Sequence, residues 1–150
     1  MIMDDVDKKI LNRIQENFPV TARPFQQIAE QTGCTEQEAL TRVKRLKDEG
    51  IIRRIGAVFD LRKLGFRSTL CAARVPEEKV AVFAAVINGL DGVTHNYRRD
   101  NAYNIWFTLI MPGEAEIAAT LQNIKNETGI DDILSLPATR TFKINAKFDV

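Results

Sequence analysis

The spacing of hydrophobic residues changes part-way along the chain. Up to about residue 50 they recur every three or four positions, the period of an amphipathic helix, whereas beyond residue 65 stretches of alternation appear. The first pattern predicts three helices, which start near residues 5, 24 and 35. Their predicted inward-facing residues are Val6, Ile10, Leu11 and Ile14, then Phe25, Ile28 and Ala29, and finally Ala39, Leu40, Val43 and Leu46.

Helix-boundary residues support this assignment. Pro24 suits a first turn, and Thr35 with Glu38 forms the pattern of a capping box. Gly33 and Gly50 are typical C-terminal stops. The segment Ile51–Phe59 then predicts a strand, a turn and a second strand. Three short helices followed by a β-ribbon indicate a winged helix-turn-helix.

The second pattern predicts alternating strands and helices. Helices are expected over 76–88, with Val80, Phe83, Ala84 and Ile87 on one face, and from Pro112-Gly113, with Ile117, Leu121 and Ile124 inward. The order βαββαβ is that of a ferredoxin-like domain, so the predicted fold class is α+β. We expect domains at 1–60 and 61–150, with Leu61–Gly65 as linker. The predicted strands are 68–75, 93–98, 103–111 and 130–136, with an optional edge strand over 139–148.

Composition places the chain among globular proteins. It has 150 residues, of which 45% are hydrophobic and 27% charged, and its net charge is +1. No apolar run approaches a bilayer span, and the acidic start Met1–Asp5 lacks the order of a secretory signal. We therefore expect a cytoplasmic protein without a membrane partner. Cys34 and Cys71 are isolated, which favours two reduced thiols over a metal or redox site.

The predicted third helix raises the question of DNA binding. It carries Arg42, Lys44, Arg45 and Lys47, and the ribbon adds basic residues that could contact phosphates. However, residues 1–60 hold ten basic and ten acidic side chains. A DNA-reading domain usually has a basic excess. These charges therefore favour a solvated helix face, and DNA is not an expected partner.

Residues 95–106 concentrate the rare chemistry of the chain: the only histidine, the only tryptophan and both tyrosines. His95 could ligate iron or act as an acid or base. Simple alternation groups His95 and Tyr97 with the apolar face of the next strand, and Arg98 with Trp106. The plain alternative is a hydrogen-bonded histidine on a mostly apolar face.

The remaining side chains of the hairpin suit a flat, carboxylate-bearing ligand. Arg98 and Arg99 could clamp carboxylates, or form a solvated hairpin tip. Trp106 could stack on a planar ligand or pack in a core. Tyr97 and Tyr103 could donate hydrogen bonds or serve as ordinary strand aromatics. A single histidine cannot build a zinc site, but it can give one axial ligand to an iron held by a tetrapyrrole. Arg140 and Lys143 could return beside the sheet.

Two sets of residues resemble known families. Asp7-Lys8-Lys9-Ile10-Leu11, the run 42–46 and Glu49-Gly50-Ile51-Ile52 resemble the Lrp/AsnC regulators, in which a winged helix-turn-helix precedes a ferredoxin-like ligand-binding and dimerising domain. The run His95-Asn96-Tyr97-Arg98, with 103–108, is more specific. It resembles the signature of the siroheme decarboxylases, Lrp-like enzymes of the alternative heme pathway and of heme d1 synthesis.

This resemblance implies a carboxy-lyase that removes CO2 from two acetate side chains of siroheme. It implies that His95 is an axial iron ligand or a nearby proton donor, and that Tyr97 and Arg98 hold or protonate the reacting region. No cofactor is implied beyond the iron tetrapyrrole substrate, because its conjugated ring can absorb the electrons. The implied partner is a homologous subunit, in a heterodimer or a homodimer. The substrate-contacting residues expected are Asn96, Arg99, Tyr103, Asn104, Trp106 and Arg140.

Two other functions stay open from the sequence. One is a DNA-binding regulator of Lrp/AsnC type that senses a small metabolite or heme. The other is a heme-binding or scaffold subunit without turnover of its own. Binding of siroheme with loss of CO2 separates the enzyme from both.

Overall fold

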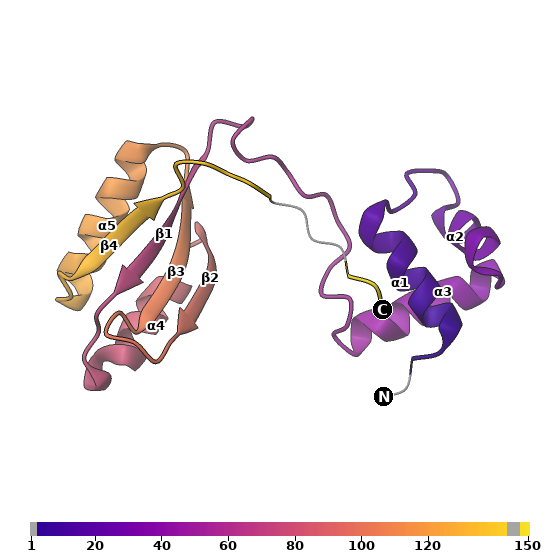
Figure 1. Cartoon of the computed structure of the whole chain (residues 1–150), viewed down its shortest axis with the longest axis horizontal. Helices are drawn as coiled ribbons and strands as arrows, with labels where there is room; N and C mark the ends of the chain where they lie inside the picture. The colour runs from indigo at the N-terminus through magenta and orange to yellow at the C-terminus, as the bar shows by residue number, and fades with distance from the viewer. Residues whose placement is uncertain (1–2, 144–147) are drawn as a thin grey trace. The chain divides into compact units, whose positions relative to one another are not determined.

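The computed structural model describes residues 3–143 and 148–150. It divides into two units, one made of residues up to Val58 with the described residues from Lys143 onward, and one from Phe59 to Phe142. We call them the helical unit and the sheet unit (Figure 1). No helix among the described residues is long and apolar enough to cross a membrane.

Three helices build the helical unit, at the positions that the sequence predicts: α1 (Asp5–Glu16), α2 (Pro24–Thr32) and α3 (Glu36–Asp48). Their ends follow from local chemistry. The Asp4 carboxylate accepts from Asp7 N and the Asp7 carboxylate from Asp4 N, a reciprocal capping box. Thr35 Oγ1 accepts from Glu38 N, which is one half of the predicted capping box, whereas the Glu38 carboxylate accepts from Arg42. Gly33 ends α2 at φ 78°, a conformation that favours glycine.

The apolar stripes of the three helices meet in one core. The prediction that Leu40 faces the core is wrong, because 42% of this residue is exposed. The predicted ribbon over 51–59 is also wrong, since none of these residues forms a strand. An isolated two-stranded hairpin is marginal in water, and no described strand in this unit supports one. The buried apolar residues are Ile10, Ile28, Ala29, Ala39, Val43, Leu46 and Ile52.

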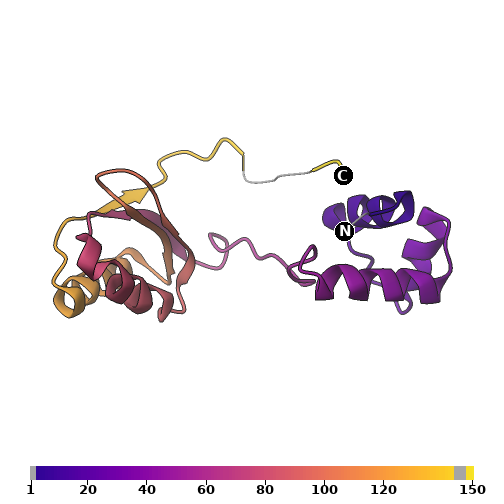
Figure 2. The same ribbon diagram turned by 90° about the horizontal axis from the view of Figure 1, so that it is seen from below.

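The sheet unit has the predicted βαββαβ order. Its strands are β1 (Arg67–Ala73), β2 (Val93–Arg98), β3 (Ile105–Met111) and β4 (Ile133–Pro137), and they lie in the order β2-β3-β1-β4 with all neighbours antiparallel. The helices are α4 (Val80–Asn88), preceded by the 3-10 turn η1 (Glu77–Lys79), and α5 (Glu114–Thr128). Figure 2 shows both helices on the same side of the sheet.

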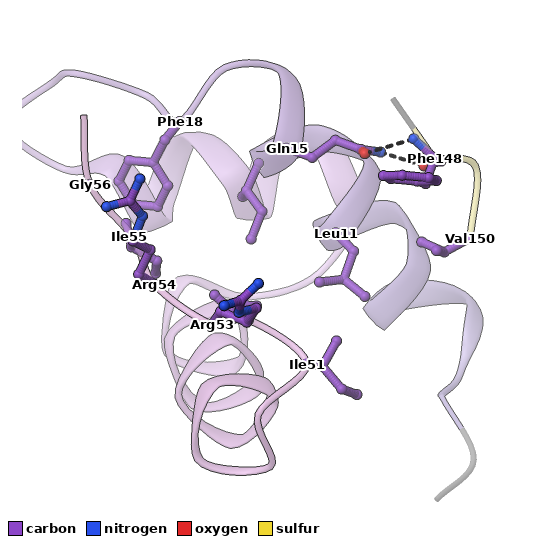
Figure 3. A pocket seen from close by; sticks show the side chains of 12 residues that line it. Leu11, Gln15, Phe18, Ile51, Arg53, Arg54, Ile55, Gly56, Phe148 and Val150 are labelled. Atoms are coloured by element: carbon purple, nitrogen blue, oxygen red, sulfur yellow. Dashed lines mark hydrogen bonds between the residues drawn. The ribbon is translucent and has the colours of Figure 1, made fainter. Parts of the chain in front are cut away.

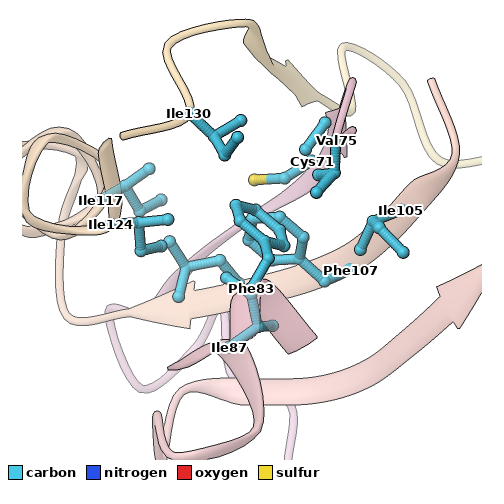
Figure 4. Packing of buried hydrophobic residues seen from close by; sticks show 11 residues of the cluster. Cys71, Val75, Phe83, Ile87, Ile105, Phe107, Ile117, Ile124 and Ile130 are labelled. Carbon is cyan, nitrogen blue, oxygen red and sulfur yellow. The ribbon is translucent and has the colours of Figure 1, made fainter. Parts of the chain in front are cut away.

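The core of this unit lies between that side of the sheet and the two helices (Figure 4). Phe83 of α4 and Phe107 of β3 meet edge to face, with their ring centroids 6.3 Å apart. Ile117 and Ile124 of α5 are buried in the same core, as predicted. Burying each large side chain contributes about 1.5–3 kcal/mol. The two helices of this unit therefore pack on one face of the sheet, and neither of them covers the other face.

The predicted extra strand over 139–148 is wrong for residues 139–143 and 148, none of which forms a strand. The part of that prediction over 144–147 lies outside the described residues. β4 starts at Ile133, later than predicted, and β3 starts at Ile105 because residues 103 and 104 belong to the hairpin connection.

Candidate active site

A β-bulge at Thr94 decides which face of the sheet carries His95. Val93 of β2 lies opposite Leu109, but the next pair is His95 with Thr108, so Thr94 is an extra residue. Directly paired residues of an antiparallel ladder point to the same face. Val93 packs against the core, whereas His95 and all residues after it are shifted by one position in the alternation.

The bulge overturns the grouping expected from alternation. Tyr97 pairs with Trp106 rather than sharing a face with Phe107, while Arg98 pairs with the buried Ile105. The prediction that His95 and Tyr97 lie with the apolar set, and Arg98 with Trp106, is therefore wrong. His95 and Tyr97 instead point away from the helices, to the side that we call the open face.

Two rows of side chains cross all four strands on the open face. The large apolar residues in these rows are well exposed to solvent: 40% for Leu70, 56% for Tyr97, 39% for Leu134 and 44% for Leu136. These residues form a flat, mostly apolar surface. From β2 to β4, the first row is His95, Thr108, Leu70 and Leu136, and the second is Tyr97, Trp106, Ala72 and Leu134.

The aromatic side chains of the open face have fixed positions. The rings of His95 and Tyr97 stack, with centroids 5.9 Å apart and planes 24° from parallel. Nδ1 of His95 lies 3.1 Å from Oγ1 of Thr94. The indole N–H of Trp106 donates to the Tyr103 carbonyl at 2.7 Å, which fixes the ring. The imidazole is therefore exposed beside two large rings on a face that a planar molecule could cover.

Cations border this surface at the end near the hairpin tip. The Arg99 guanidinium lies over the Trp106 ring, 5.1 Å from its centroid. Arg74, which follows β1, lies over the Tyr103 ring at the same distance of 5.1 Å. Such contacts hold a guanidinium against an aromatic face. Arg74 was not among the predicted site residues, because nothing near it in sequence marks it out and only strand pairing places it here.

Arg98 and Asn96 lie on the helix side. Both guanidinium Nη atoms of Arg98 donate to Glu77, at 3.0 and 2.7 Å, in a two-point ion pair. The Asn96 amide donates to Asn88 Oδ1 of α4 at 3.0 Å. The structure thus separates these two predicted site residues from His95 and Tyr97.

Three further predicted site residues have other contacts. The Asn104 side chain accepts from Val75 N at 2.9 Å and donates to Val75 O at 2.8 Å, so it joins β1 to the hairpin. The Tyr103 hydroxyl donates to Asp132 Oδ1 at 2.9 Å. Arg140 lies over Phe142, 4.9 Å from its ring centroid. No contact of Arg140 with the hairpin is found among the described residues.

The open face is a surface rather than a cleft. Four cavities of about 360–580 Å³ are lined by described residues, and none of these four includes His95, Tyr97 or Trp106. One, of about 470 Å³, lies in the helical unit between α1 and residues 51–56 (Figure 3). There the Gln15 side chain accepts from Phe148 N at 3.1 Å and donates to Phe148 O at 2.6 Å. Its lining is mostly apolar, with Gln15, Arg53 and Arg54 as the polar members.

The helical unit uses its arginines internally. Asp7 is 1% exposed, and it accepts hydrogen bonds from Arg42 at 2.9 Å and Arg45 at 2.6 Å. Arg42 also donates to Asp4 at 2.7 Å and to Glu38 at 2.8 Å. Burial alone raises the pKa of the Asp7 carboxyl, but hydrogen bonds from Arg45 and then Arg42 outweigh it, so its pKa lies below its usual value.

These pairs remove two of the basic residues that could have contacted phosphates. Lys44 Nζ lies 3.5 Å from Asp48 Oδ2, and Arg23 forms an ion pair with Glu36. Three of the four basic side chains of α3 thus have carboxylate partners within their own unit, which leaves less of the free basic surface that nucleic-acid binding requires.

Family models match both units. Residues 7–53 match the model described as the siroheme decarboxylase NirDL-like HTH domain, and residues 63–143 match the AsnC-like ligand binding domain. The chain is 53% identical to the siroheme decarboxylase alpha subunit of Oleidesulfovibrio alaskensis, over 97% of this chain and 88% of that one. It belongs to the siroheme decarboxylase family. The siroheme decarboxylase NirG subunit of Pseudomonas aeruginosa is 36% identical, over 97% of this chain and 99% of its own.

Solved structures agree with this assignment. A crystal structure of the siroheme decarboxylase NirDL is 33% identical, with a TM-score of 0.71, and matches 98% of this chain and 48% of that one. The chain thus spans about half of NirDL. Escherichia coli AsnC has a TM-score of 0.82 at 19% identity, over 97% of this chain and 98% of its own, which shows a shared fold. The expected membership and the Lrp/AsnC-like fold class are confirmed.

Proposed function

We propose that this chain is a subunit of a siroheme decarboxylase, and that the open face is where the tetrapyrrole binds. The observation that carries the proposal is the bulge at Thr94, which brings His95 and Tyr97 out of the core and beside Trp106. A core histidine needs no such register shift. NirDL, a relative, has been solved in complex with an iron-uroporphyrin III analogue, so a tetrapyrrole of this type binds within the family.

The open face supplies the parts that decarboxylation of a pyrrole acetate requires. Apolar and aromatic residues give a floor for the macrocycle, and Arg99 can hold a carboxylate that stays. Loss of CO2 leaves electron density that the conjugated ring absorbs, so the protein must orient the ring, exclude water and supply a proton to the new methyl carbon. We expect His95 or Tyr97 to donate this proton, and the exposed imidazole would also be able to ligate the iron of the substrate.

A tightly paired arginine on the leaving carboxylate would slow the reaction, because it would stabilise the ground state more than the transition state. The arginines therefore hold carboxylates that remain, and the reacting acetate lies toward the uncharged end with His95 and Tyr97. Arg98 contacts no ligand in this scheme, because its pair with Glu77 lies on the helix side of β2.

A second subunit completes the site. The open face has no cavity around His95 among the four that the described residues line, so a macrocycle lying on it stays exposed to water on its far side. Relatives carry the names of alpha, NirD and NirG subunits, and Pseudomonas aeruginosa has both of the latter. We expect a related subunit to cover the tetrapyrrole, and the pair to work in the cytoplasm.

The test is anaerobic incubation of the purified chain, with and without its partner subunit, with siroheme. A shifted Soret band reports binding, and the mass of two lost CO2 units reports turnover. Binding without loss of mass in the presence of the partner would exclude the enzyme. His95→Ala should change the spectrum of the bound pigment. Tyr97→Phe keeps the ring and is the matched control, with an unchanged spectrum and a turnover lower by about a hundredfold if the hydroxyl delivers the proton.

A further inference from the structure

A third row of residues follows the second row of the open face toward the hairpin tip. From β2 to β4 it consists of Arg99, Asn104, Arg74 and Asp132. Backbone hydrogen bonds join Arg99 N to Asn104 O at 2.8 Å, and Arg74 N to Asp132 O at 3.0 Å. The ladder register continues through these pairs, since Ala73 lies opposite Ile105 on one side and opposite Ile133 on the other. By alternation Arg74 and Asp132 share the face of Ala72 and Leu134.

We infer that Arg74 is a carboxylate-binding residue of the open face, and that Asp132 and Tyr103 position it. This rests on the function proposed above. It assigns to Arg74 the role that the sequence suggested for Arg98, because Arg98 lies on the opposite face and both of its Nη atoms are bound to Glu77. Arg99 follows β2 and Arg74 follows β1, so the border of the open face near the hairpin tip carries one guanidinium on each side of β3.

Two side-chain contacts hold Arg74 in place without burying it, and a third joins the two contacting residues to each other. Its Nε lies 3.1 Å from Asp132 Oδ2, and its guanidinium carbon is 5.1 Å from the Tyr103 ring centroid. The Tyr103 hydroxyl in turn donates to the other Asp132 oxygen at 2.9 Å. The side chain of Arg74 is still 58% exposed. Asp132 engages the Nε side, so the planar fork is oriented before a ligand arrives, which lowers the entropy lost on binding.

The ligand chemistry follows from the row order. The row of Tyr97, Trp106, Ala72 and Leu134 lies next to the row that carries Arg74 and Arg99. An apolar surface with two cations at its border fits a planar molecule that has carboxylates on its rim. Because the fork can bind a carboxylate through two parallel N–H donors, we expect a strong contact that a lysine does not reproduce.

The experiment compares Arg74→Gln with Arg98→Gln in the full chain with its partner subunit. Iron uroporphyrin III, which carries carboxylates on every ring, is the probe, and the Soret band gives the Kd. Arg74→Gln should weaken binding by about tenfold or more, and Arg74→Lys by less than that. Arg98→Gln should stay within about twofold. Thermal unfolding of each variant checks the fold, and substitution of an exposed side chain should leave Tm unchanged.

Asp132→Asn tests the positioning role. It should weaken binding by a few-fold in the wild-type background and by nothing in Arg74→Gln, because it acts through Arg74. Equal binding by wild type and Arg74→Gln would overturn the inference and leave the proposed function standing. A wild-type complex that binds no iron uroporphyrin III and no siroheme would overturn both.

Discussion

The two units of this chain use arginine in opposite ways. In the helical unit, Arg42 and Arg45 converge on the buried Asp7. In the sheet unit, Arg74 and Arg99 lie over aromatic rings at the border of an uncovered face. The first arrangement stabilises a fold and leaves little charge for a partner. The second leaves two guanidinium groups exposed, as the proposed contact with a carboxylate-bearing ligand requires. A fold shared with DNA-binding regulators therefore does not imply their function.

The sharpest test of this contrast lies within β3, where neighbouring residues face opposite sides. Phe107 is 1% exposed in the core, so Phe107→Ala should cost about 3–5 kcal/mol of unfolding free energy. Trp106→Leu should cost less than about 1.5 kcal/mol, yet weaken tetrapyrrole binding by about fivefold or more because stacking is lost. Urea unfolding and Soret titration of both variants measure the two effects. Equal binding by Trp106→Leu and wild type would remove the ring from the binding surface.

The ion pairs of the helical unit can be broken at one residue. Asp7→Ala leaves two guanidinium groups without their shared carboxylate, and we expect a loss of about 3 kcal/mol. Asp48→Ala is the matched control. The ion pair of Asp48 with Lys44 is exposed, with 3.5 Å between the charged atoms, and should contribute less than about 0.5 kcal/mol to the free energy of unfolding. Iron uroporphyrin III binding should persist in both variants at temperatures below unfolding. If Asp7→Ala and Asp48→Ala unfold alike, the network does not stabilise the unit.

The same network gives the stability a defined pH dependence. The pKa of Asp7 is lower in the folded chain than its ordinary value, so the unfolded chain takes up the proton first as the pH falls. The stabilisation is complete above about pH 4, the ordinary range of an aspartate, and is lost as the pH drops toward the lowered folded value. Acid unfolding of Asp7→Asn should show a weaker dependence there than wild type.

The smallest effect separates the two cysteines, one in each unit. Cys71 is fully buried, and burial raises the pKa of its thiol to about 12. Because the thiolate is the reactive form, Cys71 should react with a thiol reagent at pH 8 only after unfolding. Cys34 is only partly buried and should react in the folded chain. Rapid labelling of both thiols in native buffer would show that the core of the sheet unit opens readily.

Features set by local chemistry could be predicted from the sequence. Asp4, Pro24, Gly33 and Thr35 fix the ends of helices through contacts within a turn of the chain, and these ends were found where expected. The βαββαβ order of the sheet unit followed in the same way from periodicity, whereas the ribbon predicted over 51–59 did not form.

Features set by pairing between distant segments could not be predicted. The bulge at Thr94 exists only in the ladder of β2 with β3, so simple alternation put His95 on the wrong face. Asn104 looked like a ligand contact, but its amide joins the hairpin to Val75. Arg74 had no signal at all, because its neighbours Tyr103 and Asp132 are about 30–60 residues away along the chain.

The extra residue at position 94 shows how little separates a surface imidazole from a core one. A ladder of the same length without the bulge would pair Thr94 with Thr108 and His95 with Phe107, and so turn the imidazole toward hydrocarbon. Loss of the codon for Thr94 would instead keep the present partners of His95 and Tyr97, so we expect both rings to stay outside. The same side chains in the same order thus give an outer or an inner histidine according to where one pair of strands accommodates a single residue.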